Sequence, residues 1–554
     1  MITFLFSLIV SFTFQFLVYF GLGYVVALLV RKESNDFFQQ LLFGLFGLTF
    51  ILLISHFFMA ISAKLAIPVG LIACVGIFLK FKKDPLKKPE HLTALLLMTV
   101  CCLVFVSYLK QPWLIAFDTS LYHHQKVLMY TEESVWPGLA LLHTRLGFNI
   151  SFFLPVAFFY SVPFLADTLH YTVSSFWVLS FLIYLMYIIS KRDVIDQVMI
   201  LFIYGAIAIV SVVIPGIWGY SPDLVIAVIV TYMLLQVFLS LRQSQTTDFF
   251  SSIFLIALAI SIKLSSVIML VPVVAVFTVS AIRSSFQRTL ILTTVVILPF
   301  MILWTFHGYL ESGYVSYPAP FTIADADWSI PESVRLLEVE YTRNWARATI
   351  RYQEITNSFD WFFLWLDVSR PNRWLSVLLP VSFIIGVFAI RKQYKQMQRL
   401  ILFYWLVWIS IGLWFWIAPD VRFGLAVIIF VFAMTVFWVI QKNNFYSLLS
   451  RIHVGPGLIS FLSICGLTLY MIYGIYLQSA KYQYYPITTV PLSLVTGKYM
   501  SGWQPVQGIQ CGVSSTPCSP GFPVSLYKTN YQIGPFQLQG YNIENKDTEV
   551  KINE

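Results

Sequence analysis

The chain alternates between long apolar runs and short polar breaks. Most runs are close to 20 residues long, the length that an α-helix needs to cross the hydrocarbon core of a bilayer. On that length rule the pattern predicts about fourteen spanning helices. They are expected at residues 2–30, 37–61, 65–81, 91–109, 171–190, 197–214, 223–241, 249–262, 266–282, 289–306, 374–390, 400–417, 423–440 and 457–478.

The polar breaks predict how the chain is threaded. Basic residues gather in short loops, which in membrane proteins face the cytoplasm. These clusters are Arg31–Lys32, Lys80 to His91, Lys191–Arg192, Arg242, Arg283 with Arg288, Arg391 to Arg399, and Lys442 with Arg451. They fall on one side only if the apolar run 148–166, which Pro155 and Pro163 interrupt, lies at the interface instead of crossing. Both termini are then expected outside, and the first run is expected to be a retained span because it lacks a basic leader and is long for a signal peptide.

Composition agrees with this pattern. Of the 554 residues, 58% are hydrophobic and 11% are charged, which excludes an ordinary soluble domain. The net charge of +9 resides in the loops, so it indicates topology, and no nucleic-acid partner is expected. The expected fold class is an all-α polytopic membrane protein. In the polar tail, Cys511 and Cys518 are candidates for a disulfide if the tail faces an oxidising compartment.

A polar stretch, residues 116–149, separates two apolar parts of the chain. Asp118 begins it and is open to two interpretations: an N-cap of a helix over Thr119–Tyr130, or a general base or metal ligand at the membrane surface. Helical spacing places Tyr122 and Lys126 on the same face as Asp118. The adjacent His123 and His124 diverge by about 100°, which favours one of them beside Asp118 over a two-histidine zinc site.

Further ionisable residues recur at the outer ends of other apolar runs. His143 and Arg145 precede the 148–166 run, and Arg145 can either reach lipid headgroups or bind a phosphate. Asp223 follows Ser221 and Pro222, where an N-cap is the structural alternative. Lys263 interrupts an apolar hairpin, so it needs water or a partner and is a candidate site residue. Asp420 and Arg422 form either a surface ion pair or part of the same site.

At these residues the sequence resembles the GT-C superfamily of membrane glycosyltransferases. It is also similar to a group of bacterial membrane proteins that share "DTxLYHxQ…GLxxLHxRLGFNxSxF", "SPDL", "IKLS" and "RFG". The resemblance implies a GT-C-like bundle of about 14 helices (range 11–14 on the span-length rule) with outer juxtamembrane helices. The expected division is 1–90 as additional helices, 91–440 as the core with outer loops 110–170 and 307–373, 441–478 as the last span, and 479–554 as an extracytoplasmic tail.

Such enzymes move a sugar from a polyprenyl-phosphate or polyprenyl-diphosphate donor to a glycan, lipid or protein acceptor, outside the cytoplasm. The resemblance implies an inverting transferase in a bacterial inner membrane, in contact with membrane lipids. The expected roles are catalysis by Asp118 with His123 and His124, donor-phosphate binding by Arg145, Lys263 and Arg422, and cavity lining by Tyr122, Lys126, His143, Asp223 and Asp420. No cofactor is fixed by the resemblance; if a divalent cation (Mg or Mn) takes part, Asp118 is its expected ligand. The chain has Asp-Thr where the best-known pattern has Asp-Glu, so a second adjacent carboxylate is absent.

Two other classes remain open. An oligosaccharide polymerase or ligase of the O-antigen kind would also present outer arginines, together with one large loop that residues 307–373 could supply. A transporter or flippase of cell-envelope precursors would place ionisable residues within spans and often carries internal repeats. Here the candidates stand at the outer ends of spans.

Overall fold

The computed structural model describes most of the chain. The described residues are 2–30, 36–83, 118–189, 191–213, 219–243, 249–281, 290–291, 293–348, 359–391, 397–442, 492–496, 500–505, 531–533 and 536–538. The expected spans 91–109 and 457–478 lie outside these residues, as do Cys511 and Cys518.

The regular elements among the described residues are helices, apart from four short strands. The longer helices are α1 (Ile2–Leu29), α2 (Phe37–His56), α3 (Ala66–Lys83), α7 (Pro163–Ile189), α8 (Val194–Val213), α9 (Pro222–Arg242), α10 (Phe249–Ile262), α11 (Ser266–Ala281), α13 (Leu298–Ser312), α14 (Glu332–Ala346), α16 (Arg370–Ile390), α17 (Gln398–Ile417) and α18 (Val421–Lys442). The shorter ones are η1 (Ala63–Leu65), η3 (Thr119–His123), α5 (His124–Glu132), η4 (Leu139–Leu141), η5 (Thr144–Gly147), α6 (Phe153–Tyr160), η6 (Thr293–Ile297) and α15 (Trp361–Val368).

Ten helices among the described residues are long and apolar enough to span a membrane. The chain is therefore a multi-pass membrane protein, as its hydropathy pattern predicts. Helices α10 and α11 are apolar but have only 14 and 16 residues, fewer than the roughly 20 that a full span needs. They form a short hairpin, and the expected count of about fourteen spans stays a prediction.

The strands form one small antiparallel sheet in the order β1-β2-β4-β3. They are β1 (Leu492–Thr496), β2 (Met500–Pro505), β3 (Tyr531–Ile533) and β4 (Phe536–Leu538). They belong to the segment that the sequence assigns to the polar tail, so the all-α expectation holds for the described spanning part only.

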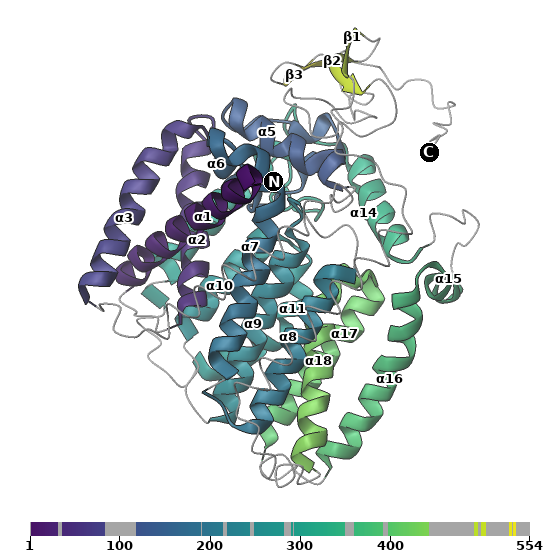
Figure 1. Cartoon of the computed structure of the whole chain (residues 1–554). Coiled ribbons are helices and arrows are strands. Elements are labelled where there is room, and N and C mark those ends of the chain that lie inside the picture. Colours follow the sequence, from purple (N-terminus) through teal and green to yellow (C-terminus); the bar gives the residue numbers. More distant parts are fainter. Residues whose placement is uncertain are drawn as a thin grey trace.

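Helix α1 packs closely on both α2 and α3 (Figure 1). Glycines permit this approach: a Cβ on Gly44 of α2 would lie 1.8 Å from the backbone oxygen of Tyr19 in α1. Likewise, a Cβ on Gly76 of α3 would lie 2.1 Å from the oxygen of Gly21. Small residues at such contacts let helix backbones approach in lipid, where helix association depends on close packing.

A second group of helices carries the functional candidates. Helix α18 packs against α8, α9, α16 and α17, while α9 also contacts α7, α10 and α11 (Figure 1). Of the 148–166 run, only the eight-residue α6 and the start of α7 are helical, with Pro163 as the first residue of α7. Helix α6 is too short to cross a bilayer, so this run forms no spanning helix of its own, and its expected place at the interface stays a prediction. Helix α6 is buried against neighbouring helices.

Candidate functional site

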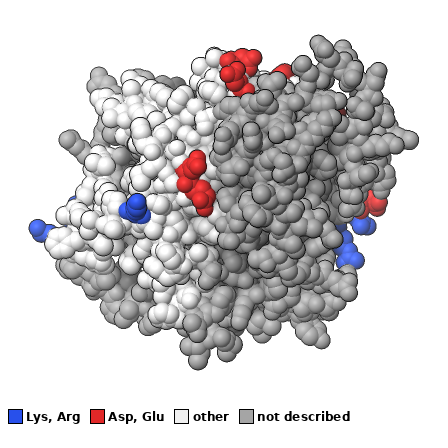
Figure 2. Space-filling model, turned by 90° about the horizontal axis from the view of Figure 1, so that it is seen from above, with Lys and Arg blue, Asp and Glu red and all other residues white. Residues whose placement is uncertain are grey.

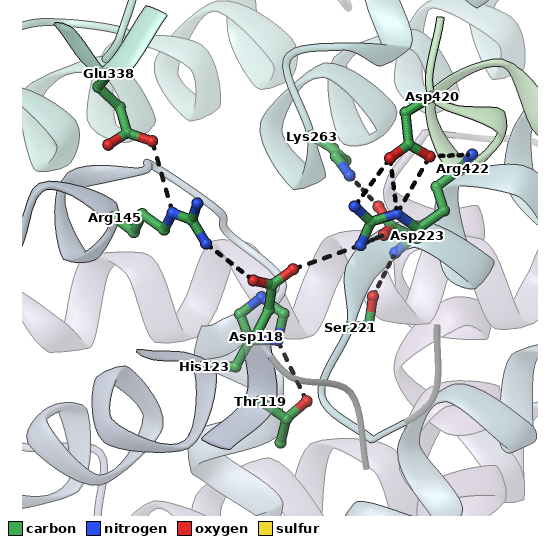
Figure 3. A network of polar contacts seen from close by, with 10 residues as sticks. All are labelled: Asp118, Thr119, His123, Arg145, Ser221, Asp223, Lys263, Glu338, Asp420 and Arg422. Atoms are coloured by element: carbon green, nitrogen blue, oxygen red, sulfur yellow. Dashed lines mark hydrogen bonds and ion pairs between the residues drawn. The ribbon is translucent and has the colours of Figure 1, made fainter. Parts of the chain in front are cut away.

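Asp118 stands at the start of the π-helical turn η3. Its backbone is already helical and its side chain makes no capping hydrogen bond, so the N-cap interpretation of Asp118 is wrong. Instead its carboxylate lies between two arginines (Figure 3). Arg145 Nη1 donates to Oδ1 at 3.0 Å, and Arg422 Nη1 lies 3.5 Å from Oδ2. Arg145 and Arg422 lie 27 and 304 residues from Asp118 in the sequence, and the fold brings both to its carboxylate.

Arg145 is held by the short turn η5. The ring nitrogen Nδ1 of His143 accepts the backbone N–H of Arg145 at 3.2 Å and so caps this turn. On its other side, Arg145 Nε lies 3.6 Å from Oε1 of Glu338, and its guanidinium stacks over the ring of Tyr341. Thr144 donates to the second oxygen of Glu338 at 2.6 Å. Helix α14, from the long loop 307–373, therefore forms one wall of the cluster.

A second acid–base pair lies beside the first. Ser221 caps α9 by accepting the backbone N–H of Asp223, so Ser221, not Asp223, is the N-cap. The carboxylate of Asp223 is free to pair with Lys263, which stands in the turn between α10 and α11. The ammonium of Lys263 also lies over the ring of Phe423, 4.5 Å from its centroid. An ammonium in an apolar hairpin needs such a partner, as the sequence predicts.

Arg422 joins the two pairs. Its guanidinium contacts Asp420 at 3.0 Å, and its Nη1 also lies 3.9 Å from Oδ2 of Asp223, besides its contact with Asp118. The Asp420–Arg422 ion pair is thus confirmed, but it belongs to a network that Figure 3 shows whole. The network has three cations (Arg145, Lys263 and Arg422) and four carboxylates (Asp118, Asp223, Asp420 and Glu338).

Solvent reaches this network only partly. The side chains of Asp118, Arg145, Lys263 and Arg422 are 24%, 19%, 20% and 19% exposed. These charges are therefore accessible to a ligand and still sheltered enough for strong electrostatic interactions. Seen from above, the described part of the surface carries scattered charged side chains and no continuous basic patch (Figure 2).

Burial and charge set the protonation of the network. Burial would raise the pKa of Asp118, but the charge of His123 when it is protonated, together with those of Arg145 and Arg422, lowers it below its ordinary value. The pKa of Glu338 is raised, mainly by burial, despite the attraction of Arg145. Burial lowers the pKa of His123 to about 4, so this imidazole is neutral near pH 7. Asp118 is thus an anion beside a neutral histidine.

The structure brings most of the predicted residues together. Asp118, Arg145, Asp223, Lys263, Asp420 and Arg422 form the network. His123 lies next to Asp118 in Figure 3, with its Nδ1 3.4 Å from the hydroxyl of Thr119. Tyr122 is buried and packs against His123 and Phe148.

Three further predicted residues, besides Tyr122 and His123, are not members of the network. His124 is fully buried and stacks on Tyr220, away from Asp118. Lys126 is also fully buried and pairs with Glu311. The shared face predicted for Asp118 and Lys126 assumed 3.6 residues per turn, but η3 is a π-helical turn, in which that spacing does not hold. His143 supports the network indirectly, because it caps the turn that carries Arg145.

Four contributors were missed by the sequence analysis: Thr144, Ser221, Glu338 and Tyr341. Glu338 is one of three glutamates in α14, and the sequence offers no signal that singles it out. Ser221 could have been found, because a serine before a proline at the first helical position is a common helix start. Only the fold shows that it leaves Asp223 free for Lys263.

The donor set was tested for a divalent cation. Among the described residues no group of three or more His, Cys, Asp or Glu side chains is placed to hold a metal ion. The carboxylates of the network are each turned toward a guanidinium or ammonium group instead. A divalent cation at Asp118 therefore stays a prediction.

Comparison with known proteins identifies the family. The chain belongs to the family described as Domain of unknown function (DUF8201), whose model matches residues 1–429. The match includes the three N-terminal helices and the whole network, and it runs across the boundary that the sequence analysis places at residue 90. No curated protein and no solved structure matches the chain.

Proposed function

We propose that the protein is a GT-C-like membrane glycosyltransferase. It transfers a sugar from a polyprenyl-phosphate or polyprenyl-diphosphate donor to a glycan, lipid or protein acceptor on the extracytoplasmic face. One observation carries this proposal: a single partly exposed carboxylate, Asp118, is shared between Arg145 and Arg422 at the end of a membrane-spanning bundle.

The cations supply the phosphate site. A planar guanidinium binds phosphate oxygens in pairs, and two guanidinium groups flanking one position suit an anion between them. A donor phosphate there takes over the hydrogen bonds that Arg145 and Arg422 now give to Asp118. Lys263, about 20% exposed, lies one ion pair away and adds a third positive charge. A lipid-linked donor also accounts for a site at the membrane surface.

Asp118 then serves as the general base. Its carboxylate accepts the proton of the acceptor hydroxyl, and the acceptor oxygen forms a bond to the anomeric carbon. The bond between that carbon and the phosphate oxygen breaks, and its electron pair leaves with the lipid phosphate, which the arginines stabilise. Release of Asp118 from the arginines raises its basicity, so donor binding activates the base.

The experiment compares Asp118→Asn with wild type in proteoliposomes that contain polyprenyl-phosphate and polyprenyl-diphosphate sugars. Asn keeps an acceptor oxygen for the arginines but cannot take up the proton. We expect sugar transfer to fall by about a hundredfold or more, which is in the range for loss of a general base. Thermal stability should change little. Asp193→Asn is the matched control, since Asp193 also pairs with an arginine, Arg242, at 2.7 Å.

Three results would count against the proposal. Full activity in Asp118→Asn would remove Asp118 as the base. Movement of an intact labelled donor across the bilayer, without cleavage, would favour a transporter or flippase. Elongation of a lipid-linked glycan by repeat units would favour the polymerase class.

A further inference from the structure

A second charged pair lies buried behind the network. Lys126 of α5 and Glu311 of α13 are both fully buried, and Lys126 Nζ lies 2.9 Å from Oε2 of Glu311. Neither residue contacts the carboxylates or cations assigned above. A buried ion pair is weak evidence for stability, because apolar residues of similar size often stabilise a fold as well. Stability alone therefore does not explain why the Lys126–Glu311 ion pair is buried at this place.

The ammonium of Lys126 has three N–H groups and three acceptors. Besides Glu311, it donates to the backbone oxygen of Leu146 at 2.8 Å and to that of Phe148 at 2.7 Å. These two carbonyls flank Gly147 and follow directly after Arg145. The buried Lys126 ammonium thus binds the backbone of the turn that places Arg145 beside Asp118.

The rest of this segment is fixed on α13 as well. Asn149 donates to the backbone oxygen of Trp304 at 2.6 Å, and the Trp304 indole donates back to the Asn149 oxygen at 3.1 Å. At Gly147 there is no room for a side chain, since a Cβ would lie 2.6 Å from that of Ala140. Contacts with η4 and α13 thus fix this segment, and Lys126 binds its backbone at Leu146 and Phe148.

Glu311 is itself held in place. The hydroxyl of Tyr130 donates to its Oε1 at 2.5 Å, and His307 Nδ1 lies 3.7 Å from Oε2. His307 in turn contacts a ring nitrogen of His56 at 2.9 Å, at the end of α2. The network behind the Arg145 turn therefore links α2, α5 and α13 without reaching the exposed site.

We propose that Lys126 and Glu311 are positioning residues, which fix the turn Thr144–Phe148 so that the Arg145 guanidinium stands between Asp118 and Glu338. That Arg145 binds a donor phosphate rests on the proposed function. The placement of the turn by Lys126 and Glu311 does not depend on it. The pair acts on the donor phosphate through Arg145 only.

The test removes the pair without leaving a buried charge. Lys126→Met alone would strand the Glu311 carboxylate, so the double variant Lys126→Met/Glu311→Gln is used; Gln still accepts from Tyr130. Hydrogen exchange is measured by mass spectrometry. We expect exchange of the amides in residues 143–148 to rise on the order of tenfold, since charged hydrogen bonds to this turn are lost. Other segments should keep wild-type exchange.

Tyr232→Phe is the matched control, because it removes a buried hydrogen bond to Asp36, 2.8 Å long, elsewhere in the bundle. In transfer assays the double variant should raise the donor KM as Arg145→Gln does. Adding Arg145→Gln to the double variant should then raise the KM little further, because the two changes act through one guanidinium.

The outcomes separate the two proposals. Unchanged exchange in residues 143–148 overturns the positioning role, whatever the activity. A uniform rise in exchange along the chain also overturns it, because the pair then serves general stability. A local rise in a protein that transfers no sugar supports the positioning role and refutes the proposed function.

Discussion

At the scale of single residues, Arg422 is the member of the network with the most partners. Its guanidinium meets the carboxylates of Asp420, Asp118 and Asp223 at 3.0, 3.5 and 3.9 Å. Lysine carries the same charge on a compact ammonium, which lacks the planar fork that spans these separated carboxylates. Arg422→Lys should therefore lower stability by about 1–3 kcal/mol and raise the donor KM at least as much as Arg145→Gln. Thermal unfolding and donor titration measure both effects. Arg242→Lys is the control, and equal effects in both variants would contradict a special role for Arg422.

His123 should make the protein sensitive to acid. Its folded pKa of about 4 lies below its ordinary value of 6.5. A group with a lowered folded pKa contributes stability above its unfolded pKa, and this contribution is lost as the pH falls toward the folded pKa. The pH window is therefore about 6.5 down to 4, and the loss is about 3 kcal/mol at 1.36 kcal/mol per pH unit. In thermal unfolding, the stability of wild type relative to His123→Gln should fall as the pH decreases through this window. A constant difference across this window would show that His123 does not titrate as described.

Single residues also show where sequence analysis succeeds and where it stops. The grouping of Asp118, Lys263 and Arg422 could be predicted, because charges at the ends of apolar spans must find water or partners. The absence of a capping role for Asp118 could not. A capping residue has an extended backbone, whereas the backbone of Asp118 is helical, and only coordinates reveal that. The ion pair of Lys126 could not be predicted either, because Glu311 lies 185 residues away in the sequence.

At the scale of elements, the turn before α9 places Asp223 beside Asp118. Ser174 of α7 donates to the backbone oxygen of Gly219 at 2.7 Å, and Gly219 has a φ of +76°. A Cβ there would also lie 3.0 Å from the hydroxyl oxygen of Thr119. Gly219→Ala should therefore cost roughly 1–2 kcal/mol from the backbone alone and lower transfer activity by displacing the residue after Asp118.

Gly412 in α17 offers the control for this change. Nothing lies within 4 Å of a Cβ at Gly412, so Gly412→Ala should leave stability unchanged or raise it by up to about 1 kcal/mol. Thermal unfolding and transfer assays compare the two variants. If both alanines behave alike, the Gly219 turn does not constrain the site.

Elements were the part of the fold that the sequence predicted best. The hydropathy runs matched the described spans within a few residues at most ends, because burial in lipid demands a continuous apolar helix. The run 171–190 was the main exception, since α7 begins at Pro163. Proline is tolerated at the first helical position, so its presence did not end the helix. The short α10 and α11 show that an apolar run need not be a full span.

At the scale of the whole molecule, charge differs between the two ends of the bundle. Helix α9 begins beside the network and continues for 21 residues to Arg242, a rise of about 30 Å, which matches the bilayer core. Arg242 pairs with Asp193 and Asp196, and Lys191 and Arg192 lie in the same α7–α8 turn. Basic loops of spanning proteins face the cytoplasm. The network should therefore face the other side, where a lipid-linked sugar donor would meet an extracytoplasmic acceptor.

Cysteine labelling measures this orientation directly. In a background without the six native cysteines, Ser333→Cys reports the network end, because Ser333 is an exposed residue of the helix that carries Glu338. Gln243→Cys reports the opposite end, as the exposed residue that follows α9. A membrane-impermeant maleimide applied to intact cells should label Ser333→Cys at once and Gln243→Cys only after permeabilisation. Both positions are solvent-exposed, so a difference in labelling reports sidedness and not burial. The reverse result would turn the network toward the cytoplasm, and Asp118, Arg145 and Arg422 would then need a cytoplasmic anionic ligand in place of the proposed donor.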